Sequence, residues 1–170
     1  VQPGGNRTDD CTMRQIALLA LLLAFAAAVY GQENILEKGL EGRVTLQLGH
    51  VPDEALDALY QEADFCLFPY REIYGSGALL MAYSYSKPVL ASSIPAFEEE
   101  TDGGCTGLLF PPEEPDALKD AILRAADWTE ETYTGTQSHI RQLVEEKYNW
   151  KHSAECLAEG YRNAWQRKQR

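Results

Sequence analysis

The sequence predicts an α/β fold in which a Rossmann-like parallel sheet is flanked by helices. Three observations predict it: short apolar runs of strand length, amphipathic helical stripes between these runs, and a spacing of about twenty residues from one run to the next. Long connections of this kind join parallel strands. With 170 residues, of which 45% are apolar and 24% charged, the chain can form one globular domain.

The N-terminal part is the least regular. Residues 1–12 have the composition of a disordered leader and precede the unbroken apolar run Ile16–Tyr30. Two interpretations of this run stay open, a signal-like segment and a buried helix. The run is shorter than the roughly 20 residues of a membrane span, and its Ala and Leu residues favour helix. We therefore predict an apolar helix over residues 13–39, with membrane association only through residues 16–30.

Residues 40–170 are regular, and each element has its own signal. One alternating segment and three buried apolar runs predict four strands, at Val44–Leu48, Phe65–Phe68, Val89–Ala91 and Gly107–Phe110. The segments between and after them carry helical stripes. They predict a helix that begins near Pro52, a helix at Gly77–Tyr85, a short acidic helical turn at Phe97–Glu100, a helix through Leu118–Ala125 and two closing helices, the last with apolar residues from Ala154 to Trp165.

Charge and cysteine usage exclude several functions. The net charge of −11 provides no basic stripe for nucleic acid. The four cysteines and three histidines show no ligand spacing, so we expect no metal site and no cofactor. Reduced thiols favour a cytoplasmic location, and Cys66 and Cys156 lie in apolar contexts typical of small core residues.

The segment Phe65–Ser92 carries the clearest functional pattern. A buried strand breaks at Pro69 into a loop with Gly75 and Gly77, and a helix follows. Backbone N–H groups in such a turn, together with the N-terminus of the helix, can receive a phosphate group. The pattern alone also fits a plain tight turn.

Four motifs in order raise this pattern to a family resemblance. They are VTLQLGHVPD, ADFCLFP, KPVLAS and TGLLFPP, and a closing helix with Trp150 and Tyr161 follows them. Over about residues 40–165 the chain resembles the C-terminal, nucleotide-sugar-binding half of retaining glycosyltransferases of the group 1 family (family 4), which have the two-domain B-type fold. The resemblance implies transfer of a hexosyl unit from a nucleotide sugar to a glycan or lipid-linked acceptor.

The resemblance also implies where the donor lies. In this family the loop after the ADFCLFP strand and the helix behind it hold the nucleoside diphosphate sugar, with the diphosphate on backbone N–H groups near the helix start. The residues implied here are Glu72, Tyr74, Gly75, Ser76, Gly77, Ala78, Met81 and Glu99. Met81 stands where the family has a glutamate that binds the ribose, and Glu72 lies one residue from the position of the family's other donor glutamate. No catalytic residue is assigned.

Two further departures shape the expectation for activity. The first strand–loop units of the family's domain, with their basic pair for the diphosphate, are expected to be missing, with the apolar segment Ile16–Tyr30 in their place. The N-terminal acceptor domain is the expected missing partner. Because transfer needs a closed cleft with positive groups on the leaving diphosphate, we expect the isolated chain to bind donor weakly and to transfer little. A location at the inner face of the membrane stays open. Two other functions stay open as well: an inactive remnant that binds a partner, and a Rossmann-like module unrelated to these enzymes.

Overall fold

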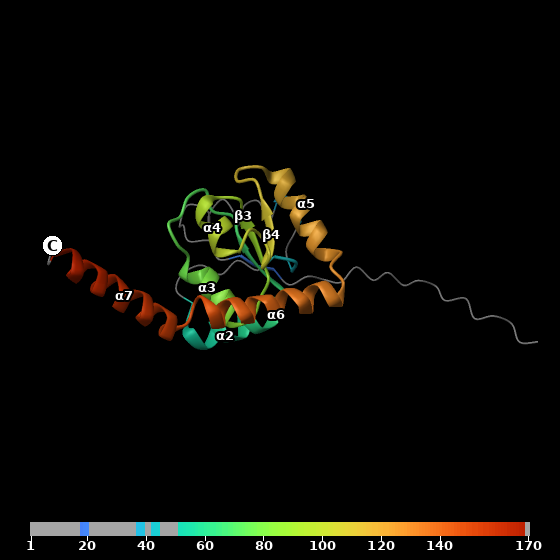
Figure 1. The fold of residues 1–170 in the computed structure, drawn as a ribbon. Helices are drawn as coiled ribbons and strands as arrows, with labels where there is room; N and C mark the ends of the chain where they lie inside the picture. The colour runs from blue at the N-terminus through green and yellow to red at the C-terminus, as the bar shows by residue number, and fades with distance from the viewer. Residues whose placement is uncertain (1–17, 21–36, 40–41, 45–50, 169–170) are drawn as a thin grey trace, which may run out of the picture.

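The computed structural model describes residues 18–20, 37–39, 42–44 and 51–168 (Figure 1). In this part of the chain a four-stranded sheet has the order β1-β2-β3-β4, and every pairing is parallel. Its strands are β1 (Leu18–Ala20), β2 (Phe65–Phe68), β3 (Val89–Ser92) and β4 (Gly107–Phe110). The predicted α/β fold class, with a parallel sheet flanked by helices, is confirmed.

Six helices accompany the sheet in the described residues. They are α2 (Asp53–Glu62), α3 (Gly77–Ser84), α4 (Pro95–Glu100), α5 (Pro115–Ala126), α6 (Glu130–Glu146) and α7 (Trp150–Lys168). The predictions for α3 and α4 are confirmed to within two residues at each end. The strand predicted at Val44–Leu48 lies outside the described residues, except for Val44.

The strand β1 corrects the prediction for the apolar N-terminal segment. Leu18–Ala20 pairs with β2 in the register Leu18↔Phe65 to Ala20↔Leu67, so the helix predicted over residues 13–39 is wrong at these positions. The expectation that the first strands are missing is wrong for this strand. Backbone pairing with a distant strand outweighs the local helix preference of Ala and Leu. The remainder of the segment lies outside the described residues, apart from residues 37–39.

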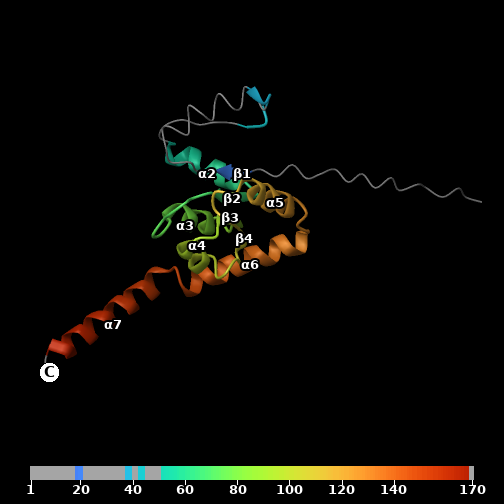
Figure 2. The same ribbon diagram turned by 90° about the horizontal axis from the view of Figure 1, so that it is seen from above.

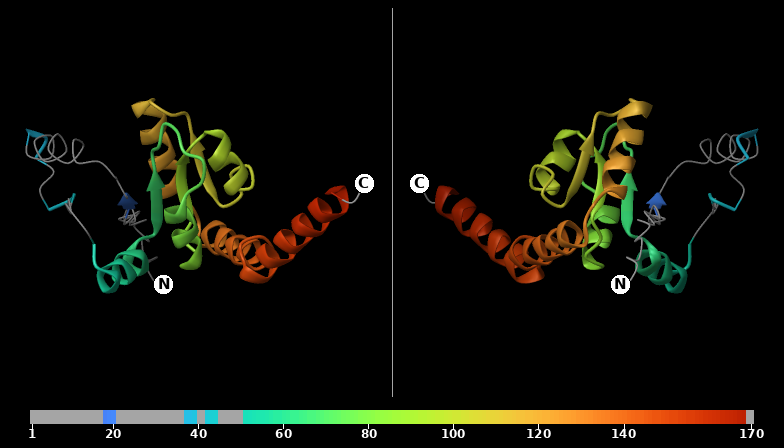
Figure 3. Two further views of the ribbon diagram at one scale, coloured as in Figure 1. Left: turned by 90° about the vertical axis from the view of Figure 1, so that its left-hand side faces the viewer. Right: turned by 90° about the vertical axis from the view of Figure 1, so that its right-hand side faces the viewer.

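The strands β2 and β3 are buried on both faces of the sheet, which explains their apolar runs. Side chains of β2 alternate between the faces: Cys66 and Phe68 lie in one cluster with α3 and α4, whereas Phe65 and Leu67 lie in another with α5. The first cluster also receives Tyr60 of α2 and Ile140 of α6. Figures 2 and 3 show α5 on one side of the sheet and α3 and α4 on the other. The core therefore consists of three layers.

The last helix differs from the others, because none of its residues is buried. It leads away from the three-layered core (Figures 1 and 3). Its predicted apolar stripe is present but exposed, and Cys156, expected in the core, is exposed too. Cys66 is fully buried, as predicted. Among the described residues, no helix is both long and apolar enough to span a membrane.

Candidate functional site

The N-terminus of α3 is built by Ser76 at the end of the β2–α3 loop. Ser76 has an extended backbone and a buried side chain, and its Oγ accepts a hydrogen bond from the N–H of Leu79 at 3.1 Å. The N–H of Leu80 donates to the carbonyl of Ser76, also at 3.1 Å. A serine cap satisfies one of the four N–H groups that the first helical turn leaves without an intrahelical acceptor.

Two of those N–H groups stay available. Among the described residues, the structure gives the N–H groups of Gly77 and Ala78 no acceptor. A Cβ built on Gly77 would meet no atom within 4 Å, so the space over this backbone is open. The helix N-terminus carries a partial positive charge that favours an anion there. The sequence-predicted group Gly75–Ala78 is thus one contiguous, mostly open surface.

Glu100, at the end of α4, is part of this site, although the sequence did not indicate it. Its Oε1 accepts the N–H of Ser76 at 3.2 Å and lies 3.5 Å from the Cβ that Gly75 would carry. The two residues are 24 positions apart, so no local spacing links them. The family resemblance implies Glu99 as a donor residue, but Glu99 is exposed, whereas its neighbour Glu100 turns toward α3.

The Glu100 carboxyl group is poorly solvated. Burial raises its pKa, and the negative charge of Glu99 adds to this rise, while the hydrogen bond from Ser76 and the charge of Lys147 act against it. Its second oxygen, Oε2, is buried and has no hydrogen-bond partner among the described residues. The carboxyl group therefore has one acceptor atom to spare, directly beside the N-terminus of α3.

The remaining predicted donor residues lie on the same loop and helix. Glu72 and Tyr74 are exposed on the loop, and the Tyr74 side chain is fully in solvent. Met81, on α3, is 44% exposed. The structure thus brings the Gly75–Ala78 backbone together with Glu100, and it leaves Glu72, Tyr74 and Met81 on the open surface around them.

Tyrosines fix α3 in place. Tyr83 is buried, and its hydroxyl lies 2.6 Å from Thr106 Oγ1 and donates to the carbonyl of Glu100 at 3.1 Å. Tyr85 stacks on Tyr60 with ring centroids 5.0 Å apart. Both tyrosines therefore pack in the core or at its rim. Because Tyr83 contacts Glu100 from α3, it helps to hold α4 against the site.

The described side chains at the N-terminus of α3 form no group of possible metal ligands. The site presents backbone N–H groups, one carboxyl group and open space. This arrangement suits an anion or a hydroxyl-bearing ligand.

Comparison with known proteins identifies the fold. The model of the family Glycosyl transferases group 1 matches residues 15–127, a range that includes β1 and the whole β2–α3 site. A search of curated proteins found no match.

Two solved structures have a fold similar to that of this chain. The sucrose-phosphate synthase of Thermosynechococcus elongatus is similar, with 26% identity and a TM-score of 0.66 over 87% of this chain and 38% of its own. The catalytic domain of starch synthase IV from Arabidopsis thaliana, solved with ADP and acarbose, has 15% identity and a TM-score of 0.59 over 90% of this chain and 39% of its own. The chain thus spans about two fifths of each of these proteins.

The family match covers well over half of the chain and contains every strand of the sheet, so the alternative of an unrelated Rossmann-like module is excluded. The comparisons give no support to the alternative of an inactive remnant. The chain belongs to the group 1 glycosyltransferases.

Proposed function

We propose that this chain is the donor-binding half of a retaining glycosyltransferase that moves a hexosyl unit from a nucleoside diphosphate sugar to a glycan or lipid-linked acceptor. The observation that carries the proposal is the open N-terminus of α3, where the N–H groups of Gly77 and Ala78 have no acceptor in the described residues. The diphosphate of the donor supplies negatively charged oxygens for these groups.

Glu100 supports a hydroxyl-bearing ligand next to the diphosphate. Met81 leaves the site without the carboxylate that the family resemblance implies on α3. Glu100 brings a carboxylate from α4 to within 3.2 Å of the Ser76 nitrogen. In the proposed complex, a small movement of α4 turns the spare Oε2 toward a hydroxyl of the donor. Hydrogen bonds to a charged acceptor contribute about 1.5–3 kcal/mol each.

The acceptor side of the cleft belongs to a second domain. This chain spans 38% and 39% of the two solved proteins. In addition, α7 exposes four large apolar side chains, which need a partner surface to be buried. They are Trp150, Leu157, Tyr161 and Trp165. We propose that the acceptor domain covers this stripe and closes the cleft over the donor.

A pair of glycine substitutions tests the donor site. Gly77→Ala adds one methyl group over the proposed diphosphate position, where it displaces no protein atom. Loss of one hydrogen bond to the phosphate corresponds to about 10- to 100-fold weaker binding of uridine, guanosine or adenosine diphosphate and their sugars. Isothermal titration calorimetry measures this loss.

Gly135→Ala in α6 is the matched control, because a Cβ there also meets no atom within 4 Å. Replacing a glycine by an alanine inside a helix should raise the free energy of unfolding by roughly 1 kcal/mol. We expect unchanged nucleotide affinity in this variant. Equal nucleotide affinities in the wild-type chain and in Gly77→Ala would show that the diphosphate does not bind at the N-terminus of α3.

A further inference from the structure

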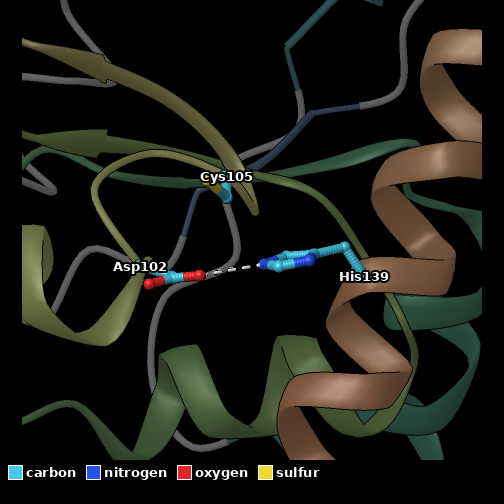
Figure 4. Close-up of side chains that lie close together, drawn as sticks. All are labelled: Asp102, Cys105 and His139. Atoms are coloured by element: carbon cyan, nitrogen blue, oxygen red, sulfur yellow. Dashed lines mark hydrogen bonds and ion pairs between the residues drawn. The ribbon is translucent and has the colours of Figure 1, made fainter.

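Three side chains with metal-ligand chemistry converge away from the donor site. Asp102 and Cys105 lie on the turn between α4 and β4, and His139 lies on α6 (Figure 4). One ligand atom from each lies within 4.8 Å of the other two. The Nε2 of His139 is 3.2 Å from Oδ2 of Asp102. No local spacing predicts this group, because Asp102 and His139 are 37 positions apart.

The end of α4 holds the two ligands of the turn in position. The N–H of Gly103 donates to the carbonyl of Glu98, and the N–H of Asp102 donates to that of Glu99, which is the Schellman pattern of a helix end. Asp102 takes the left-handed position of this motif, with φ 53°. The N–H of Cys105 then donates to the Asp102 carbonyl at 3.3 Å. The backbone thus forms the turn without a metal ion.

We propose that Asp102, Cys105 and His139 bind one Zn²⁺ ion, with water as the fourth ligand. Imidazole nitrogen, thiolate sulfur and carboxylate oxygen are the zinc ligands of proteins, whereas Mg²⁺ and Ca²⁺ select oxygen alone. The Cys105 thiol loses its proton to solvent on binding. The two negative ligands then balance the charge of the ion.

The geometry needs little adjustment. Tetrahedral zinc with bonds of 2.0–2.3 Å places its ligand atoms about 3.3–3.8 Å apart. The distance of 3.2 Å between His139 and Asp102 is already close to this range. Cys105 belongs to an exposed turn, so its sulfur can approach by about 1 Å through a side-chain rotation. The side chains of Asp102 and His139 are 57% and 37% exposed, which leaves space for the water ligand and a route of entry.

A bound ion would fasten the α4–β4 turn to α6. This turn follows Glu100 directly, and Thr106 at its other end contacts Tyr83. The proposal depends on neither the donor nor the transfer reaction, so it can fail or succeed independently of the proposed function.

Cobalt provides the first test. The chain is stripped with a chelator under reducing conditions and titrated with Co²⁺, whose charge-transfer absorption reports a bound thiolate. We expect a band that saturates at one ion per chain and is lost in Cys105→Ser. Zn²⁺ should displace the cobalt and abolish the band.

Two other thiols need controls. Cys156 lies 3.5 Å from His152 Nε2 on α7 and forms a competing pair of possible ligands. Cys11 lies outside the described residues. The double variant Cys11→Ser, Cys156→Ser should retain the full cobalt band. If the band instead disappears in this variant and persists in Cys105→Ser, the metal binds elsewhere and the proposal is overturned.

Zinc affinity and thermal stability complete the test. Loss of one direct ligand should weaken Zn²⁺ binding by at least about 100-fold in Cys105→Ser, Asp102→Asn and His139→Gln, since even outer partners of metal ligands contribute 10–100-fold. Zn²⁺ at one hundred times its dissociation constant should raise the melting temperature of the wild-type chain by about 5–10 °C. All three substitutions are at the surface, so the metal-free variants should melt like the metal-free wild type. A wild-type chain that shows no thiolate band and no shift in melting temperature would refute the site.

Discussion

At the scale of single residues, the carboxyl group of Glu100 lies in an unusual environment. It accepts one backbone N–H and keeps a buried oxygen without a partner among the described residues. Burial raises its pKa, which means that the folded protein holds this proton more tightly than the unfolded chain does. A partly buried carboxyl group of this kind reduces stability when it is ionised, and a perturbed carboxyl group of this kind is a candidate for ligand binding.

The pH dependence of stability follows from this raised pKa. The stability that protonated Glu100 contributes is fully present below the pKa of this group in the unfolded chain, about 4.5. It is lost as the pH rises through the raised pKa of Glu100 in the folded protein. Wild-type chain should therefore gain stability, relative to Glu100→Gln, as the pH falls from neutral toward 4.5. Urea unfolding at several pH values measures the difference. Glu155→Gln, at an exposed position on α7, is the surface control for the same substitution. A difference between wild type and Glu100→Gln that does not change with pH would show that Glu100 is solvated.

The residues of the donor site and of the proposed zinc site were predictable to different degrees. Gly75–Ala78 could be found from sequence, because a strand, a loop with glycines and a helix follow one another locally. Glu100 and His139 could not, because each reaches its partner across more than twenty positions of the chain. The geometry that joins them exists only after α4 and α6 have packed on α3 and on the α4–β4 turn. Glu100 and His139 could not be predicted because their partners are far away in the sequence, not because of their residue types.

At the scale of elements, the glycine of the TGLLFPP motif has a structural explanation. Gly107 opens β4 and pairs with Val89 of β3. A Cβ on Gly107 would overlap the carbonyl oxygen of Val89 and lie 2.7 Å from its carbon. Both atoms belong to backbone, so neither can move without separating the two strands.

We therefore expect Gly107→Ala to destabilise the fold by about 3 kcal/mol, at the upper end of the usual cost of overpacking. Chemical unfolding measures the change, with Gly135→Ala as the control that adds the same methyl group in open space. A Gly107→Ala chain as stable as the wild type would mean that β3 and β4 are not in close register at this point.

The elements themselves follow from the sequence where the signal is local. The strands β2, β3 and β4 are short apolar runs that the two packed faces of the sheet require, and α3 follows from its serine cap and apolar composition. For β1 the local signal predicts the wrong structure, because Ala and Leu favour helix in isolation. Its pairing with β2, 47 positions away, decides its structure, and no local pattern reports that pairing.

At the scale of the whole molecule, α7 divides the chain into a packed core and an exposed arm. Its stripe of large apolar side chains contributes nothing to the described core. Leu157→Ser should change the free energy of unfolding of this chain by less than about 0.5 kcal/mol. Ile140→Ala, in the fully buried position on α6, should cost about 2–5 kcal/mol.

If the proposed acceptor domain covers α7, the same Leu157→Ser substitution should weaken its association with this chain. Transfer activity of this chain together with that domain is the readout, compared with Glu155→Gln on the same helix. Loss of activity with unchanged stability would place α7 in the interface between the domains. Large destabilisation of this chain by Leu157→Ser would contradict the account, because it would mean that α7 packs on the core.

The most direct measurement for the central claim is the response of individual backbone amides to a nucleoside diphosphate sugar. Two-dimensional NMR of the labelled chain should show saturable shifts, at millimolar ligand, for the amides of Gly77 and Ala78. The amide of Gly135, an equally open glycine in α6, should stay unchanged. Saturable shifts confined to other elements, or no shifts with any of the three nucleotides and their sugars, would contradict a donor site at the N-terminus of α3.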